Sequence, residues 1–244
     1  MAKERHLNNA PIIEALIDIR VKLPPHIDVV TLRKIHSSIS KEYPEEKEII
    51  RGRITFKAAK ATAEDAIQHE CAYISANEKQ IAQARLDGFT FSRLRPYETW
   101  KSLRSEAYRL WRLYAEVSSP ESITRVALRY INRLEIPIPF KDFNEYITAP
   151  PSIPPNLPQE GLSSFLTRIV IPVPAFKAVA IITQALEPRT SEKIASVILY
   201  IDVFKEQQFD SDGKEAWEVI DKLHTLKNNI FFESITEEMA SLCE

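Results

Sequence analysis

The trio His69, Glu70 and Cys71 is the one cluster in the sequence that combines metal-ligand and nucleophile chemistry. If this segment is extended, His69 and Cys71 project to the same face, so they could share a zinc ion, or the imidazole could deprotonate the thiol. A zinc site needs further ligands, and the remaining histidines show no paired spacing: His6, His26, His36 and His224. The sequence therefore predicts a buried cysteine where a loop meets a strand, with no metal site and no catalytic residue.

Motifs typical of phosphate binding and hydrolysis are also missing from the sequence. Glu45, Glu46 and Lys47 have the acid-x-lysine spacing of some nucleases, but they follow the helix-ending Pro44, where we expect no strand to fix them against a second acid. The glycines are isolated, so they build neither a P-loop nor a dinucleotide fingerprint: Gly52, Gly88, Gly161 and Gly213. Serine-nucleophile elbows and zincin helices are absent as well. We therefore predict no cofactor and favour a protein that is not an enzyme.

A basic helix is the first candidate binding surface. At helical spacing, one side of residues 98–117 is apolar and the opposite side carries Lys101, Arg104, Tyr108, Arg109 and Arg112. The stretch 85–133 holds ten basic and five acidic residues, although the whole chain has a net charge of -2. Arginine beside an exposed tyrosine suits phosphate contact with base stacking, and it suits an acidic protein surface equally well. The third alternative is an ordinary solvated helix face.

An arginine-bearing strand is the second candidate surface. Arg125, Arg129 and Arg133 alternate with apolar residues, so they project from one face of the strand 123–138, while Asn132 lies among the apolar residues of the other face. Such a face is solvated, paired with acidic residues, or used to bind a ligand. We favour structural pairing with acids, and we expect Asn132 to satisfy backbone groups.

The elements that position these residues fall into two similar series. Residues 12–23 and 123–138 both show the period-two pattern of a half-buried strand, and each is followed by a helix, several strands and a closing helix. This order predicts an α+β fold with mainly antiparallel sheets and helices packed on one side, built as two related β-α-β(3-4)-α halves. We place the halves at 1–119 and 120–244, either as two units or as one continuous domain. The order resembles the duplicated saddle of TATA-binding-protein-like folds, although the second half has one strand fewer.

The remaining elements are expected at short intervals between these landmarks. The closing helix 98–117 places Trp100 and Trp111 in the apolar stripe, which predicts both as core residues, and Asp87-Gly88 is a hairpin signal. Five prolines make 149–161 a stiff extended loop, and Pro172 predicts an edge strand. The other helices are expected at 28–43, 142–147, 212–226 and from 236, and the other strands at 53–58, 73–76, 79–86, 89–94, 165–173, 178–186 and 196–205.

Composition limits the compartment and the class of partner. The chain has 244 residues with 32 basic and 34 acidic side chains, which argues against bulk attraction to nucleic acid or to an anionic membrane. Two cysteines far apart in sequence, Cys71 and Cys243, are typical of a reducing compartment. The polar first residues and the early acids fit neither a signal peptide nor a membrane span, so we expect a cytoplasmic protein.

Four segments together resemble a known family. They are Asn-Ala-Pro-Ile-Ile-Glu-Ala at 9–15 with Asp-Ile-Arg at 18–20, Tyr-Glu-Thr-Trp at 97–100, Leu-Arg-Tyr-Ile-Asn-Arg at 128–133 and Ile-Asp-Val-Phe at 201–204. In this order and spacing the chain resembles a sporadically distributed, functionally uncharacterised prokaryotic family of chains of similar length. The resemblance implies an accessory gene of the kind found in mobile, anti-phage defence or toxin–antitoxin modules, and it implies no reaction, substrate or catalytic residue.

Two functional hypotheses follow from the sequence. The first is a non-enzymatic cytoplasmic binding or regulatory protein that binds a partner protein, with association between copies of the chain as a variant. The alternative is a nucleic-acid-associated protein that uses the basic helix 98–117 and the arginine strand 123–138. The nearly neutral chain favours the first hypothesis, and the basic stretch 85–133 favours the second.

Overall fold

The computed structural model describes residues 1–57, 60–154, 156, 158, 161–189 and 191–244, with side chains left out of the description at 50–57 and 60–69. The strands are β1 (Ile12–Lys22), β2 (Glu45–Lys57), β3 (Lys60–Ile74), β4 (Gln80–Arg85), β5 (Gly88–Leu94), β6 (Ser122–Pro137), β7 (Leu166–Val173), β8 (Ala178–Leu186) and β9 (Ile194–Phe209). The helices are α1 (Val29–Ile39), α2 (Trp100–Ser118), α3 (Lys214–Ser234) and α4 (Glu237–Ser241), with 3-10 turns at η1 (Phe143–Glu145) and η2 (Pro174–Phe176).

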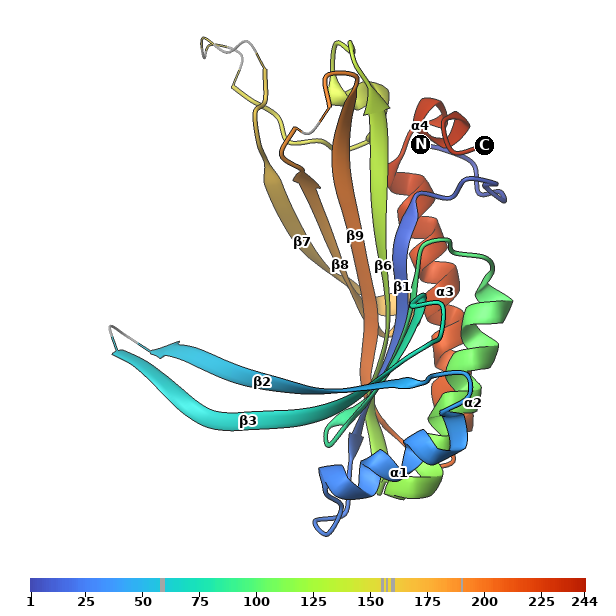
Figure 1. Cartoon of the computed structure of the whole chain (residues 1–244). Coiled ribbons are helices and arrows are strands. Elements are labelled where there is room, and N and C mark those ends of the chain that lie inside the picture. Colours follow the sequence, from blue (N-terminus) through green and yellow to red (C-terminus); the bar gives the residue numbers. More distant parts are fainter. Residues whose placement is uncertain (58–59, 155, 157, 159–160, 190) are drawn as a thin grey trace.

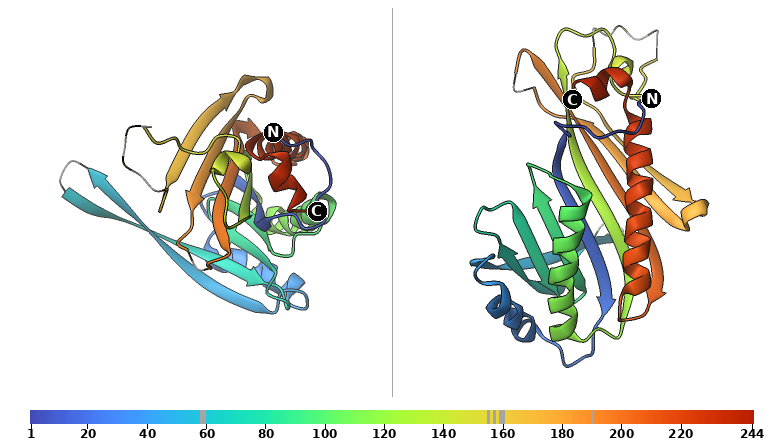
Figure 2. Two further views of the ribbon diagram at one scale, coloured as in Figure 1. Left: turned by 90° about the horizontal axis from the view of Figure 1, so that it is seen from above. Right: turned by 90° about the vertical axis from the view of Figure 1, so that its right-hand side faces the viewer.

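The strands form one antiparallel sheet in the order β2-β3-β4-β5-β1-β6-β9-β8-β7. The main helices cover one face of this sheet: α2 packs on β1 and β5, and α3 packs on β6 and β9 (Figure 1). The two helices run side by side, and the sheet bends so that the β2–β3 hairpin and the β7–β8 pair swing away from them (Figure 2). The predicted α+β class with antiparallel pairing is therefore confirmed. No helix in the described ranges combines the length and apolar content needed to cross a membrane.

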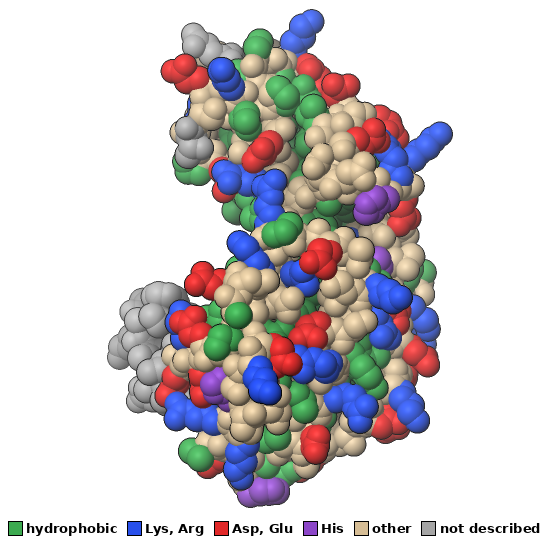
Figure 3. Space-filling model, turned by 45° about the vertical axis from the view of Figure 1, so that its right-hand side comes forward, with side chains coloured by type: hydrophobic (Ala, Val, Ile, Leu, Met, Phe, Trp, Pro, Cys, Tyr) green, Lys and Arg blue, Asp and Glu red, His purple; other side chains and the backbone are tan. Residues whose placement is uncertain are grey.

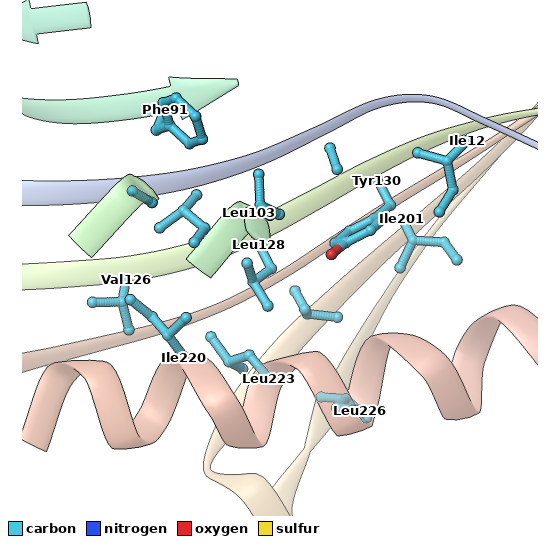
Figure 4. Close-up of a cluster of buried hydrophobic side chains, with 14 of the residues drawn as sticks. Ile12, Phe91, Leu103, Val126, Leu128, Tyr130, Ile201, Ile220, Leu223 and Leu226 are labelled. Carbon is cyan, nitrogen blue, oxygen red and sulfur yellow. The ribbon is translucent and has the colours of Figure 1, made fainter. Parts of the chain in front are cut away.

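The hydrophobic core lies between the sheet and the helices (Figure 4). Along β1, Ala15, Ile17 and Ile19 are fully buried, and β6 contributes the even-numbered residues from Val126 to Tyr130. Side chains of α3 pack against these buried strand residues from the helix layer. The core residues labelled in Figure 4 are Ile12, Phe91, Leu103, Val126, Leu128, Tyr130, Ile201, Ile220, Leu223 and Leu226. The period-two pattern of the sequence thus identifies the buried face of both long strands.

The register of β1 fixes which side chains share a face. Ile17 lies opposite Leu128 of β6 and Phe91 of β5, so apolar side chains from three strands point toward the helices together. On its β5 side, β1 approaches Gly88 so closely that an added Cβ would lie 2.1 Å from the carbonyl oxygen of Ile19. Glycine is therefore required at this position, and the predicted Asp87-Gly88 hairpin is confirmed by the antiparallel β4–β5 pairing.

The β2–β3 hairpin is longer than the sequence pattern indicated. We expected strands at 53–58 and 73–76, and residues 53–57 and 73–74 do lie in strands. The expectation that Glu45 to Lys47 lie outside any strand was wrong, because β2 already begins at Glu45 and pairs with β3. Residues 60–70 are rich in alanine and charged residues, which have low β-propensity and hide the pattern. Pairing with β2 along the whole strand, joined by β4 from Glu70 to Ile74, supplies the strand conformation instead.

The two tryptophans of α2 occupy different environments. Trp111 is 2% exposed and contacts Phe89 and Tyr114 through their rings, as expected of a core residue. Trp100 is only partly buried and stacks on His224 of α3 with ring centroids 4.2 Å apart. The core assignment is thus confirmed for Trp111, whereas Trp100 lies at the border of the core, where it joins the two helices.

We expect Trp111→Ala to lower the free energy of unfolding by about 3 to 5 kcal/mol, because the truncation leaves a cavity beneath α2. Urea denaturation followed by circular dichroism measures the loss. Trp100→Ala is the matched control and should cost clearly less, since that indole is already partly in contact with solvent. Equal losses in the two variants would contradict the assignment of Trp111 to the core.

A buried lysine lies on the helix side of the sheet. Lys227 of α3 is 6% exposed, and its ammonium nitrogen lies 3.9 Å from the centre of the Tyr130 ring. Burial lowers the pKa of Lys227 from 10.5 to about 7, against the attraction of Glu4. No carboxylate in the described residues forms an ion pair with Lys227. The folded protein therefore carries a desolvated positive charge below pH 7.

We expect Lys227→Met to raise the free energy of unfolding at pH 6 and to have progressively less effect as the pH rises toward 10. Between pH 7 and 10.5 the unfolded chain binds more protons at Lys227 than the folded chain, so the stability of the wild type rises with pH over this interval. Denaturant unfolding at several pH values measures the difference. Lys222→Met, at an exposed position of the same helix, should show no such trend.

Candidate functional site

The sheet face that points away from the helices, called here the concave face, carries the arginines of β6. Residues of β1, β6 and β9 alternate between the two faces, and Asp18, Arg129 and Asp202 belong to neighbouring positions of the concave face. Figure 1 shows this face between the β2–β3 hairpin and β7, on the side opposite α2 and α3. The structure thus brings the predicted arginine strand to the centre of an open sheet face.

Asp18 is the hub of an ion cluster on the concave face. Its carboxylate is 2% exposed and accepts hydrogen bonds from Arg85 at 2.8 Å, Arg125 at 3.0 Å and the Thr90 hydroxyl at 2.9 Å. Burial by itself would raise the pKa of Asp18, but Arg85, Arg20 and Arg125 outweigh it and lower the pKa to about 2. The cluster therefore holds a buried charge that is ionised throughout the physiological range.

A second carboxylate, Asp202 of β9, joins the other arginines. Its Oδ2 atom accepts from Arg129 Nε at 3.0 Å, and Arg125 lies 3.8 Å from Oδ1. Burial raises the pKa of Asp202 despite both arginines. Arg125 itself lies over the ring of Phe204, with 4.3 Å between the guanidinium carbon and the ring centre. Structural pairing, the interpretation favoured from the sequence, accounts for Arg125 and for one side of Arg129.

Arg133 lies at the end of the same row and is the most open of the three arginines. Its side chain is 37% exposed, and its Nε atom lies 2.7 Å from the carboxylate of Glu187. Asn132, on the opposite face, donates to the carbonyl oxygen of Leu199 at 3.0 Å, so it satisfies a backbone group as expected. Partly exposed apolar and aromatic side chains surround the row on the concave face: Leu16, Ile131, Ile198 and Tyr200.

The basic helix face is partly engaged within the molecule. Arg104 of α2 forms a bidentate ion pair with Asp221 of α3, with distances of 2.7 and 2.8 Å. Arg109 pairs with Glu106 one turn earlier on the same helix. Tyr108 packs edge-on against Trp217, with 5.1 Å between ring centres.

Lys101 and Arg112 are exposed and form no ion pair with any residue that the structure describes. On the side of the molecule shown in Figure 3, lysine and arginine side chains alternate with aspartate and glutamate and do not form one continuous basic area. The predicted set is therefore divided: Arg104, Arg109 and Tyr108 also support the packing or charge balance of α2, whereas Lys101 and Arg112 are open.

The cluster at His69 can be described only in part, because the side chain of His69 lies outside the described residues. Cys71 is 1% exposed, and burial raises the pKa of its thiol although Arg33 and Tyr73 oppose that shift. Among the described residues, no group of three or more histidine, cysteine or acidic side chains is placed to hold a metal ion. Cys71 therefore lacks the lowered pKa of a nucleophilic thiol.

Two cavities lie away from the concave-face cluster. One of about 920 Å³ lies beneath the proline-rich loop and is bordered by Phe140, Phe143 and Leu162. The other, of about 650 Å³, lies between α2, the segment after α1 and the start of β4, and is bordered by Tyr43 and by Arg109 of the predicted set. Neither cavity contains Arg125, Arg129 or Arg133.

Comparison with known proteins adds no identity to this geometry. No protein-family model matches the chain, and no curated protein sequence matches it. The concave face and α2 are therefore the features from which a function can be inferred.

We expect Asp18→Asn to lower the free energy of unfolding at pH 7 by about 3 to 5 kcal/mol, because it leaves buried Arg85 and partly buried Arg125 without their shared carboxylate. The lowered pKa means that this contribution is present above about pH 4 and is lost as the pH falls toward 2. The stability of the variant should accordingly depend less on pH between 4 and 2. Denaturant unfolding across this interval measures both effects.

Asp87→Asn is the matched control, since Asp87 also pairs with Arg20 and Arg85 but is 34% exposed. Its loss of stability should be the smaller of the two. If Asp18→Asn costs less than Asp87→Asn, Asp18 is not the hub of the cluster.

Proposed function

We propose that this protein is a non-enzymatic binding protein that holds a partner protein against the concave face of its sheet. The observation that carries the proposal is the composition of that face around Arg129 and Arg133, where partly exposed arginines are interleaved with Leu16, Ile131 and Ile198. Protein interfaces are enriched in arginine and in aromatic side chains, their fully buried centre is more apolar than the rest of the surface, and they lack the deep, chemically equipped pocket of most enzymes.

The position of the surface supports the same proposal. Helices α2 and α3 cover the other face of β1, β5, β6 and β9, so the concave face is the broad side of these strands that a partner can reach (Figure 2). The buried Asp18 and Asp202 clusters give that face a rigid base, because each carboxylate joins side chains from different strands. A rigid surface loses little conformational entropy when a partner binds.

The alternative function is association with nucleic acid through α2. The observation that favours it is that Lys101 and Arg112 are exposed beside Tyr108, which is 40% exposed. A basic pair with an aromatic ring suits phosphate contact and base stacking. In this alternative α2 binds the nucleic acid, and the arginine strand on the far side of the sheet contributes a second contact.

We also propose two points about the evolutionary origin of the chain: an internal duplication and membership of a prokaryotic family. The halves 1–119 and 120–244 are proposed to be related, because β1 and β6 are central, β5 and β9 flank them, and α2 and α3 follow those flanking strands in the chain. The segments at 9–15, 97–100, 128–133 and 201–204 support a place in the sporadic prokaryotic family, and hence in a mobile, defence or toxin–antitoxin module in the cytoplasm.

The test is affinity purification of the full chain from its own cells, followed by mass spectrometry and an absorbance ratio for nucleic acid. We expect a stoichiometric partner protein with the wild type and loss of that partner with Ile131→Ser/Ile198→Ser, because the double substitution removes the apolar centre of the concave surface. Ile169→Ser/Ile171→Ser is the matched control, since these isoleucines are exposed on β7 and face the other side of the sheet. The control variant should retain the partner.

Lys101→Glu/Arg112→Glu separates the alternative from the main proposal. Exposed charges contribute about 0 to 1 kcal/mol to stability, so this variant should melt as the wild type does and should keep the protein partner. Loss of co-purified nucleic acid in this variant alone would favour the alternative. Its affinity for nucleic acid would fall with log salt by about 0.7 to 0.9 per phosphate contacted. Retention of every partner by the concave-face variant would contradict the main proposal.

A further inference from the structure

The arginines at the open end of the β6 row have unused hydrogen-bonding capacity. Arg129 Nε donates to Asp202 at 3.0 Å, whereas Arg133 Nε lies 2.7 Å from Glu187 in an ion pair that lacks hydrogen-bond geometry. The terminal nitrogens of both guanidinium groups donate no hydrogen bond to any residue that the structure describes. Each side chain is about one-third exposed, so these donors face the solvent above the concave face.

The two open guanidinium groups have a defined spacing. Arg129 and Arg133 are four residues apart on one strand and project from the same face, which places their Cα atoms about 13 Å apart at a rise of about 3.3 Å per residue. Ile131 projects between them, with Leu16 on β1 and Ile198 on β9 beside the row. Along β6 the surface therefore presents a hydrogen-bond donor at Arg129, an apolar side chain at Ile131 and a second donor at Arg133.

The neighbouring acids make a polyanion such as nucleic acid a poor ligand for the surface around Arg129 and Arg133. Glu14 lies on the same face, opposite Ile131, and has no ion-pair partner in the described part of the chain. Asp202 and Glu187 already occupy the inner side of the two arginines. A phosphate backbone would bring its regular charges against these carboxylates, whereas single carboxylates above Arg129 and Arg133 avoid them.

We propose that the concave face binds an extended protein segment that carries two carboxylates at positions i and i+4 with an apolar residue at i+2. The carboxylates take the free terminal donors of Arg129 and Arg133, and the apolar side chain rests on Ile131. A bidentate contact between a carboxylate and two guanidinium nitrogens adds geometric specificity as well as energy. This inference rests on the proposed function, because it names the chemistry of the partner on the same surface.

The test is selection of a random dodecapeptide display library against the full-length protein. We expect aspartate or glutamate at two positions four apart, with an apolar residue midway, among the enriched peptides. A synthetic peptide of the enriched sequence should bind the wild type and lose about tenfold or more in affinity with Arg129→Gln/Arg133→Gln. Arg112→Gln, at an exposed position of α2, is the matched control and should bind as the wild type does.

Arg133→Glu gives a second measurement that is independent of the Asp202 cluster. Its one ion-pair partner in the described residues, Glu187, is 31% exposed, so the repulsion between the new carboxylate and Glu187 should lower the thermal melting only slightly. Selection against Arg133→Glu should replace the acid at one end of the pattern by a lysine or arginine. Salt should weaken the wild-type complex only moderately, because two charge pairs and an apolar contact share the affinity.

Three results would overturn the inference. They are enrichment of peptides without paired acids, an acidic pattern that persists unchanged with Arg129→Gln/Arg133→Gln, and tighter binding of a single-stranded oligonucleotide than of any selected peptide. The first two would leave the proposed function intact if Ile131→Ser/Ile198→Ser still releases the cellular partner. Retention of that partner would instead refute the proposed function itself.

Discussion

The pairing of β1 with β6 is the constraint on which the other features of the structure depend. Its register sets Ile17 against Leu128, and therefore Asp18 against Ala127, so one face of the pair is apolar and the other is charged. A slip of one residue would turn the aspartate toward α2 and α3 and the isoleucines toward solvent. Core, helix packing and ion cluster thus follow from one alignment of two strands. Since β5 and β9 pair with the outer edges of these strands, the same register extends across the middle of the sheet.

The ion clusters and the core stabilise this register in different ways. Burial of isoleucine and leucine stabilises any register that places them on the apolar face. The buried charge of Asp18, in contrast, is paired only in the register that brings Arg85 from β4 and Arg125 from β6 to it. Removing such a buried carboxylate from its partners is costly, so competing alignments are penalised. The charged face therefore adds specificity to the stability that burial provides. The same arginines supply a firmly held surface for recognition.

Local periodicity was sufficient to predict much of the fold and the arginines of the candidate site, but not the acidic residues that pair with them. The alternation in 12–23 and 123–138 identified both buried faces, and the helical stripe located α2 and Trp111. The acidic partners were not predicted, because Asp18 and Asp202 meet the β6 arginines only through strand pairing between distant parts of the chain. The pairing of Arg104 with Asp221 escaped prediction for the same reason. A signal was present at Asp18, an acid at the middle of a half-buried strand whose polar face also carries Glu14 and Arg20.

The place of β9 between β6 and β8 also has a consequence for how the chain is assembled during translation. The first five strands can pair while the rest of the chain is still being made, and β6 can then join β1, but the outer edge of β6 stays open until Phe209 has left the ribosome. At about 5 to 20 residues per second, the stretch from Pro137 to Phe209 takes roughly 4 to 15 seconds to synthesise. Throughout that interval the nascent protein exposes the unpaired backbone of its central strand, the kind of edge that other unfinished chains can pair with. The order of the strands thus makes the speed of the ribosome a determinant of how much of this protein reaches its native sheet.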